Sequence, residues 1–359
     1  MSLYQERLDR VCREMEDAGL SQLLVTDHLS IYYLTGLYVA PFERFWCLMV
    51  KTDGRHTLFA NQLFALGETG FATVTLTDND DVAAAVAPYI ASGSLGVDKN
   101  MAARFLLPIL AACPQARAVL GSGCVDSVRA RKDEAEKALM RQASDINDQC
   151  MEKLAAYIHE GATEQECADY LVKCYGAYGC EGLSFDPIVS FGANAADPHH
   201  APDGTVVKEG DCIVIDIGCK KDGYCSDMTR TYFWKKADPR YTAIHDLVRE
   251  ANERARALVR PGVRLCDVDA AARDHIAAAG YGEYFTHRLG HFIGMEDHEQ
   301  GDVSAVNAAP AQEGMVFSIE PGVYLPGEFG VRVEDLVIVT KDGCECLNHV
   351  DRKWQILGL

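Results

Sequence analysis

The sequence has few basic residues. Lys and Arg together account for 34 of the 359 residues, against 53 for Asp and Glu, and the formal net charge is −19 at pH 7. A protein that binds nucleic acid gains most of its affinity by neutralising phosphates with Lys and Arg. We therefore expect no nucleic-acid partner. The acidic balance instead favours solubility and a weak attraction for cations.

Long apolar runs and paired cysteines are also missing. No stretch of about 18 apolar residues occurs, so we expect no membrane-spanning helix and no membrane partner. The first residues are charged and amphipathic and lack the apolar segment of a secretory signal. The 14 cysteines are scattered, without a Cys-x-x-Cys pair, so a disulfide framework is not expected. These absences predict a reduced, cytoplasmic protein.

Alternating strand and helix patterns fill the first third of the chain. Residues 4–18 carry apolar side chains at helical spacing, and Gly19 follows as a stop. A buried strand at "LLVTD" comes next, and then a hairpin in "RFWCLMVKTDGRHTLFA" with Asp53-Gly54 in its turn. This part of the chain contains no chemical motif.

A long charged helix separates this part from the remainder. It lies in "RARKDEAEKALMRQASDINDQCMEKLAAYI", and Thr163 with Glu166 then forms a capping box that opens the next helix. After Ser184 the pattern changes to long strands, glycine turns and acids. We therefore predict two domains, residues 1–127 and residues 128–359.

The first of two predicted hairpins carries a pair of acids. It lies in "DCIVIDIGCKKDGYCSDMTRTYFW", where Asp216 interrupts an apolar strand. Turn chemistry prefers Asp222-Gly223 as the loop, which makes Asp216 and Asp227 diagonal neighbours. If the loop lies one residue earlier, the two acids face each other directly. Both registers put the two side chains on the same face of the sheet.

The second hairpin, "MVFSIEPGVYLPGEFGVRVEDLVIVT", repeats this arrangement. A loop centred on Gly327 sets Glu320 opposite Glu334, and both acids adjoin apolar strands. Single acids are mostly exposed, so one alternative is that these are solvated acids on edge strands. The pairing of four acids within apolar runs argues against it, because a lone buried carboxylate is expensive.

Four converging carboxylates would repel one another and raise their pKa values. Divalent cations resolve this conflict, since oxygen ligands suit Mn, Co(II) or Mg. One imidazole would shift the preference toward Mn, Co or Zn. The acids therefore predict a metal site.

Five histidines lie close to the hairpins in the sequence. His287, His291 and His298 fall within twelve residues between the two hairpins, and His199 and His200 precede the first hairpin. A lone histidine is more often a satisfied polar residue than a ligand. Their density beside four acids favours a shared site.

Together, these motifs resemble the metal-dependent Xaa-Pro peptidases with the pita-bread fold, which include prolidase, aminopeptidase P and methionine aminopeptidase. The family pattern is D-x-G, an Asp eleven positions on, G-H-x-x-G, E-P-G and R-x-E-D. The chain has "DIG" at 216–218, "SDMTRT" at 226–231, "GHFIG" at 290–294, "IEPG" at 319–322 and "VRVED" at 331–335. Each motif is weak alone, but the five in order are specific. The resemblance covers roughly residues 130–359.

The resemblance implies an α/β fold in which a smaller creatinase-like lobe precedes a pita-bread domain with an antiparallel sheet and flanking helices. It implies two divalent metal ions, with Mn(II) or Co(II) favoured and Zn(II) possible. Asp227 and Glu334 would bridge the two ions. Asp216 would complete the shell of one ion, and His291 and Glu320 that of the other.

The resemblance also implies catalytic roles. Two metal ions can hold a bridging water and lower its pKa, which gives a hydroxide that attacks the carbonyl of the Xaa-Pro bond. His199 and His298 match family residues that contact the substrate carbonyl and the transition state. Glu320 would carry a proton from the water to the leaving proline nitrogen.

Three further residues match the substrate side of the family's pocket. His287 matches a pocket histidine, and Arg332 matches an arginine on the substrate or carboxylate side. Arg288 matches an arginine of some bacterial prolidases, and it would bind the carboxylate of a dipeptide. Its alternative is a structural salt bridge. Phe292 departs from the Gly of many relatives, which puts the shape of the pocket in doubt.

The implied activity is hydrolysis of Xaa-Pro dipeptides, as in prolidase, because Arg288 and the compact length fit a bacterial dipeptidase. The alternative is aminopeptidase P, which removes Xaa from longer Xaa-Pro peptides. A creatinase-like or lyase-like enzyme, or a non-catalytic binding protein of the same fold, is disfavoured because no metal ligand is lost. The expected partners are small proline-containing peptides and, since relatives are commonly dimers, a second copy of the chain.

Overall fold

The structure is a computed structural model that describes residues 2–359. The chain forms two compact units, one ending at Arg129 and one beginning at Ala130. The boundary predicted from the sequence lies two residues earlier. In the part of the chain that the structure describes, no helix combines the length and the apolar character that crossing a membrane requires.

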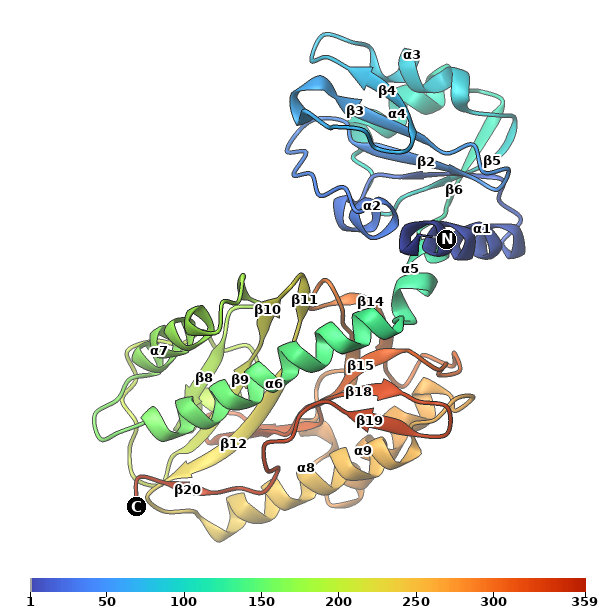
Figure 1. Ribbon diagram of the computed structural model, residues 1–359. Coiled ribbons are helices and arrows are strands. Elements are labelled where there is room, and N and C mark those ends of the chain that lie inside the picture. Colours follow the sequence, from blue (N-terminus) through green and yellow to red (C-terminus); the bar gives the residue numbers. More distant parts are fainter. Residues whose placement is uncertain (1) are drawn as a thin grey trace. The chain divides into compact units, whose positions relative to one another are not determined.

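The N-terminal unit is built on one mixed sheet of six strands with helices on both faces (Figure 1). Its strands, in sheet order, are β4 (Ala72–Leu76), β3 (Thr57–Asn61), β2 (Cys47–Lys51), β1 (Gln22–Val25), β5 (Gly93–Val97) and β6 (Ala116–Leu120). Its helices are α1 (Leu3–Asp17), α2 (His28–Thr35), α3 (Val82–Val86), α4 (Ala103–Ala112) and α5 (Gly123–Ala130), which ends at the join.

Two sequence-based predictions for this unit are confirmed. Helix α1 ends at Asp17, and Gly19 follows with a φ of 69°, a conformation that favours glycine. Strands β2 and β3 pair antiparallel, and Gly54 in their turn has a φ of 80°.

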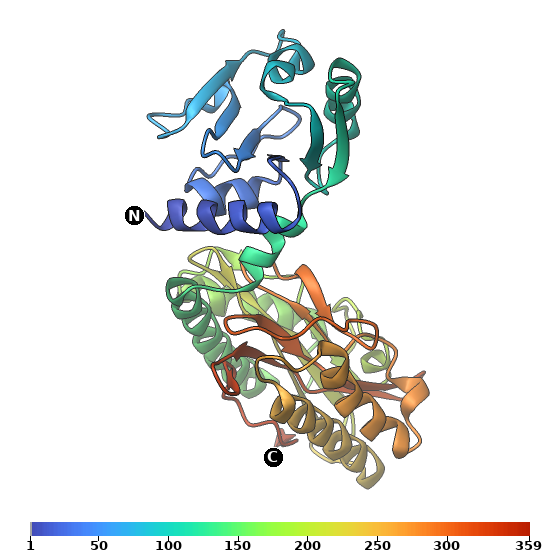
Figure 2. The same ribbon diagram turned by 90° about the vertical axis from the view of Figure 1, so that its right-hand side faces the viewer.

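The second unit places its strands between two pairs of helices (Figure 2). The helices are α6 (Glu134–Tyr157), α7 (Glu164–Ala177), α8 (Pro239–Leu258) and α9 (Leu265–Ala278). One sheet, in order, has β20 (Ile356–Leu357), β12 (Met228–Trp234), β9 (Cys212–Ile217) and β8 (Ile188–Phe191). A second has β14 (Glu299–Val303), β13 (Gly290–Phe292), β15 (Val316–Ile319), β18 (Asp335–Val339) and β19 (Cys344–Cys346).

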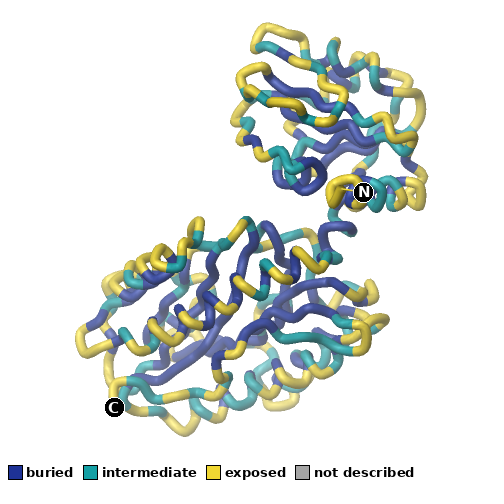
Figure 3. Tube along the Cα trace, in the orientation of Figure 1, coloured by how far each residue is buried: buried dark blue, intermediate teal, exposed yellow. Residues whose placement is uncertain are grey.

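Two smaller sheets complete this unit. One pairs β16 (Gly322–Leu325) with β17 (Phe329–Arg332). The other has β11 (Tyr224–Cys225), β10 (Cys219–Lys221) and β7 (Gly182–Leu183). The predicted capping box of Thr163 with Glu166 opens α7, and Asp133 with Glu136 forms a second one at the start of α6. The central strands are buried, whereas loops and outer helix faces are exposed (Figure 3).

Strand alternation decides which side chains reach the interior of the second unit. In β9, Ile213, Ile215 and Ile217 belong to the apolar core that also contains residues of α6 and α7. Cys212 and Val214 belong instead to the core that contains residues of α8 and α9. Because successive side chains of a strand alternate between faces, Asp216 shares the face of Cys212 and Val214.

Candidate metal centre and active site

The first hairpin adopts the register that turn chemistry prefers. Lys221 pairs with Tyr224, so Asp222-Gly223 is the two-residue loop, and both loop residues have positive φ, 49° and 82°. Asp216 pairs with Thr229 in the same register. This confirms that Asp216 and Asp227 are diagonal neighbours on one face of the sheet.

The second hairpin also has its predicted register. Gly322 pairs with Arg332 and Ile319 pairs with Asp335, so the loop is centred on Gly327. Glu320 and Glu334 lie opposite each other between these two stretches of pairing. The backbone N–H of Glu334 donates to the carbonyl of Thr229 at 3.2 Å, which joins this hairpin to β12 of the first.

All ten residues that the sequence assigns to the site line one cavity of about 520 Å³ in the second unit. The five expected metal ligands, here called the ligand cluster, are Asp216, Asp227, His291, Glu320 and Glu334. The other five are His199, His287, Arg288, His298 and Arg332.

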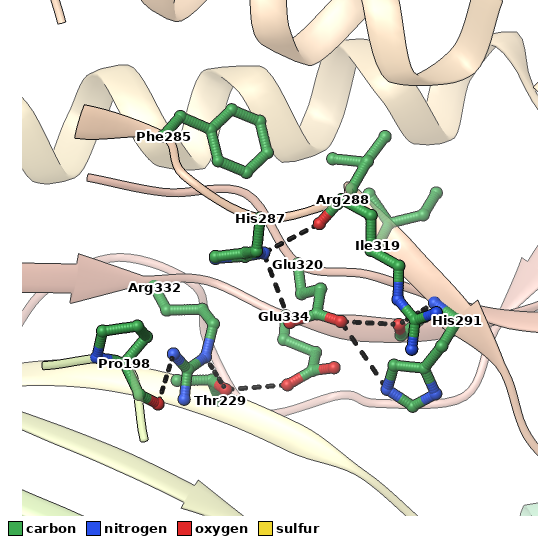
Figure 4. A network of polar contacts seen from close by, with 12 residues as sticks. Pro198, Thr229, Phe285, His287, Arg288, His291, Ile319, Glu320, Arg332 and Glu334 are labelled. Carbon is green, nitrogen blue, oxygen red and sulfur yellow. Dashed lines mark hydrogen bonds and ion pairs between the residues drawn. The ribbon is translucent and has the colours of Figure 1, made fainter. Parts of the chain in front are cut away.

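Three acids of the ligand cluster, Asp227, Glu320 and Glu334, lie close to the buried imidazole of His291. Its Nε2 lies 3.3 Å from Asp227 Oδ2 and 3.6 Å from Glu320 Oε1. Asp227, His291 and Glu334 each offer a ligand atom, and these atoms lie within 4.8 Å of one another. Figure 4 shows His291 and Glu320 pointing toward each other, with Glu334 beside them.

Three carboxylates of the cluster are incompletely satisfied. Within residues 2–359, the buried atoms Asp216 Oδ1, Asp227 Oδ1 and Glu334 Oε1 have no hydrogen-bond partner. Buried polar groups in native proteins are nearly always paired, so each such atom needs an explanation. Converging carboxylate oxygens beside an imidazole nitrogen are a donor set that fits divalent metal ions.

Burial and mutual repulsion act on the charges of the ligand cluster. Burial, together with the neighbouring carboxylates, raises the pKa of Asp227 and of Glu334 well above the usual range. The pKa of Glu320 is raised to about 8 by burial and by Asp216. Burial lowers the pKa of His291 to about 3. A neutral imidazole is the form that ligates metals.

Arg332 is held tightly inside the site. It donates to Asp216 Oδ2 at 2.6 Å, to the hydroxyl of Tyr324 at 2.8 Å and to the hydroxyl of Thr229 at 2.9 Å. It also donates to the carbonyl of Pro198 at 3.4 Å (Figure 4). Thr229 in turn donates to Glu334 Oε2 at 2.7 Å. Arg332 therefore connects the two hairpins, and its guanidinium is hydrogen-bonded to other residues of the site.

Arg288 makes fewer contacts within the site than Arg332 does. Its Nη2 lies 3.3 Å from Nδ1 of His298, and the residue is half-buried at the cavity. Nε2 of the same histidine lies 3.4 Å from Asp297 Oδ2. The ring of His298 lies 3.9 Å from that of His291, between centroids. Arg288 and Asp297 thus approach different nitrogens of His298, close to the ligand cluster.

His287 and His199 lie elsewhere around the cavity. Nδ1 of His287 is 2.7 Å from the Arg288 carbonyl, and its Nε2 is 3.0 Å from the Tyr324 hydroxyl. Its Nδ1 also lies 4.0 Å from Glu320 Oε2. His199 is exposed and lines the same cavity.

Sequence reasoning missed several residues of the site. Asp297 lines the cavity, and Tyr324 and Thr229 hold Arg332. His200, one of the five histidines named from the sequence, also lines the cavity. His200 Nε2 is 2.8 Å from the carboxylate of Glu164, which is completely buried. Asp297 could have been found from the sequence, because it directly precedes His298.

Packing explains the positions of Phe292, which departs from the family pattern, and of Glu299, which follows His298 in the sequence. Phe292 lies in the apolar core and stacks on Phe317, with 5.6 Å between ring centroids. The opposite side of the strand carries His291, so the Phe292 ring does not narrow the pocket. Glu299, which follows His298, accepts a hydrogen bond from Lys132 at 2.8 Å in a buried ion pair.

Two protein-family models match the chain, one in each unit. Residues 138–341 match the model of metallopeptidase family M24, and residues 7–131 match the creatinase/prolidase N-terminal domain. An uncharacterized peptidase of Staphylococcus aureus is 33% identical over 355 residues, which cover 96% of this chain and 99% of that protein.

Solved structures are similar over nearly the whole chain. A prolidase from Thermococcus sibiricus has a TM-score of 0.92 and 32% identity, covering 99% of this chain and 100% of its own. An X-Pro aminopeptidase from Thermotoga maritima has a TM-score of 0.82 and 30% identity, covering 96% and 100%. The chain therefore belongs to metallopeptidase family M24 and carries a creatinase/prolidase N-terminal domain before the pita-bread domain.

Proposed function

We propose that the protein hydrolyses Xaa-Pro dipeptides with two divalent metal ions held by the ligand cluster. One observation carries the proposal: three buried carboxylates that line the same cavity as His291 each keep an oxygen without a hydrogen-bond partner among the described residues. The ions would be held by Asp216, Asp227, His291, Glu320 and Glu334. Four carboxylates and one imidazole suit Mn(II) or Co(II), and Zn(II) is a third candidate.

When bound, the two ions would supply Lewis-acid polarisation and a water of lowered pKa. The chain's own groups would orient the substrate and move the proton. Glu320 lies 3.6 Å from His291 and 4.0 Å from His287, and it would deliver a proton to the leaving proline nitrogen. His298 and His199 would donate hydrogen bonds to the oxygen of the scissile carbonyl as negative charge develops there.

Two features of the cavity support a dipeptide substrate. Phe185, Pro187 and Ile188 line it and offer an apolar surface for the proline ring. Arg288 is the cavity arginine with the looser contacts, so its guanidinium is the better candidate for the proline carboxylate. Arg332 is already committed to four acceptors within the site.

The test compares Leu-Pro, Gly-Pro and a tripeptide Xaa-Pro-Yaa, with the protein first chelated and then supplied with Mn(II) or Co(II). We expect dipeptide hydrolysis to vanish on chelation and to return with metal. Preference for the tripeptide would favour the aminopeptidase P alternative, for which the similarity to the Thermotoga maritima enzyme speaks. Failure to cleave any of the three peptides with metal present would contradict both readings.

Replacement of Arg288 separates the same alternatives. Arg288→Ala should raise KM for Leu-Pro by about tenfold or more, because a charge-assisted hydrogen bond to the proline carboxylate would be lost. The tripeptide lacks a carboxylate at that position, so its KM should change less. Arg240→Ala is a matched control, since Arg240 pairs with Glu328 on the surface of the same unit. Equal effects of Arg288→Ala on both peptides would remove this support for a dipeptidase.

A further inference from the structure

Asp297 is a carboxylate of the cavity that the proposed chemistry does not use. Its side chain is 18% exposed, and its Oδ1 is buried without a hydrogen-bond partner among residues 2–359. Besides the ligand cluster, the carboxylates that line the cavity are Asp297 and the exposed Asp186. A buried carboxylate oxygen without a partner is unfavourable until a cation or a hydrogen-bond donor reaches it.

The position of Asp297 follows from His298. Arg288 lies 3.3 Å from Nδ1 of that imidazole, and Asp297 lies 3.4 Å from Nε2. The two nitrogens of an imidazole face different directions, so a cation and an anion flank His298 on separate edges. If the proline carboxylate binds Arg288 and the scissile carbonyl lies at His298, the Xaa residue extends toward Asp297.

We propose that Asp297 selects substrates whose Xaa side chain is positively charged, such as Lys-Pro and Arg-Pro. The proposal rests on the proposed function and adds a preference for Xaa to it. The α-ammonium group adjoins the scissile carbonyl and would lie close to the carboxylates of the ligand cluster. The side chain of Asp297 is 18% exposed, against 5% for Asp227 and 11% for Asp216, and is similar in exposure to Glu320 at 16%. A long Xaa side chain would bring its charged end to this carboxylate.

The experiment measures ratios of kcat/KM between substrates of similar size. Lys-Pro is compared with Met-Pro, and Glu-Pro with Gln-Pro, for the metal-loaded wild type and Asp297→Asn. The Lys-Pro to Met-Pro ratio should fall about fivefold in Asp297→Asn, as expected for a partly exposed ion pair. The Glu-Pro to Gln-Pro ratio should rise, because a repelling charge has gone.

A matched control for Asp297→Asn removes one negative charge from another position of the second unit. Asp222 is exposed in the turn of the first hairpin, and its φ of 49° is one that Asn tolerates. Asp222→Asn should leave both substrate ratios as in the wild type. Ratios rather than single rates are compared, so a partial loss of folded protein does not mimic the effect.

Three results would overturn the proposal. The first is an unchanged Lys-Pro to Met-Pro ratio in Asp297→Asn. The second is an equal change of that ratio in Asp222→Asn, which would show an effect of net charge alone. The third is loss of bound metal in Asp297→Asn, because Asp297 lies with His291 and His298 in a group that could hold an ion. If the wild type cleaves none of these dipeptides, the proposed function itself fails.

Discussion

Two buried acids stand next to each other at the end of the second hairpin, and they are satisfied in opposite ways. Asp335 is fully buried and accepts hydrogen bonds from Arg230 at 2.9 Å and from Arg352 at 2.7 Å. Glu334 is 1% exposed, and its Oε1 has no hydrogen-bond partner in the described part of the chain. Burial alone does not distinguish the two carboxylates.

Their electrostatics do distinguish them. Burial would raise the pKa of Asp335, but the guanidinium groups of Arg230 and Arg352 outweigh it and lower that pKa. Burial and the neighbouring carboxylates Glu320 and Asp216 raise the pKa of Glu334. The charge of Asp335 is balanced by arginines of the chain, whereas Glu334 keeps an oxygen that a bound cation would satisfy. A buried acid that the protein leaves unpaired therefore points to function.

The largest expected effect is on catalysis. His291→Ala or Glu320→Ala should reduce hydrolysis of Xaa-Pro dipeptides by about a thousandfold or more, because each removes a proposed metal ligand. Steady-state assays with added Mn(II) measure this. As a control, Glu328→Ala removes an exposed acid of the second hairpin, which also carries Glu320, and this variant should retain activity. Full turnover by His291→Ala without a second bound ion would contradict the two-metal account.

The arginine-paired acid should matter for stability. Asp335→Asn leaves the buried Arg230 without its charged partner, so the free energy of unfolding should fall by roughly 3–5 kcal/mol. Urea denaturation of the metal-loaded protein measures the change. A loss of less than about 1 kcal/mol would mean that the arginines do not depend on this acid.

The stability of the metal-free protein should fall as pH rises. The folded-state pKa of Glu320 is raised to about 8 from the ordinary value of 4.5. Between these values the folded state binds the proton more tightly than the unfolded state, so stability is lost as pH increases through this window. Besides burial, the nearby carboxylate of Asp216 raises the pKa of Glu320. The guanidinium groups of Arg332 and Arg288 lower that pKa, but not enough to offset the rise.

Melting temperatures between about pH 5 and pH 8 test this expectation, with and without saturating Mn(II). The slope against pH should be steeper without metal, because bound cations favour the ionised carboxylates. A metal-free protein that gains stability over the same window would contradict the repulsion inferred for the ligand cluster.

The smallest expected effect has the opposite sign from that of Asp335→Asn. Glu334→Gln removes one of the repelling charges, so the metal-free protein should gain on the order of 1 kcal/mol in the free energy of unfolding at pH 8. The same variant should lose metal binding. Destabilisation comparable to that of Asp335→Asn would show that the two neighbouring acids have the same structural role.

The sequence predicted those parts of the site that depend on local rules. The Asp222-Gly223 turn and the loop centred on Gly327 set both registers, and each register brings the two acids of its own hairpin together. Both follow from turn chemistry and strand alternation, which operate over a few residues.

Contacts between distant segments could not be predicted in this way. Lys132 pairs with Glu299 across 167 positions, and Arg332 reaches Asp216 across 116. Neither pair has a characteristic spacing, because each depends on how separate elements pack. The position of Phe292 in the core has the same origin, since it depends on Phe317 of the neighbouring strand.

The number of Mn(II) ions bound per chain, measured by equilibrium dialysis, tests the central claim most directly. We expect two ions per chain for the wild type and fewer for Asp227→Asn, because Asp227 is one of the acids that would hold the ions. Asp335→Asn, if folded, should still bind two. A wild type that binds no Mn(II) or Co(II), or an Asp227→Asn variant that binds both ions as tightly, would contradict the assignment of the ligand cluster.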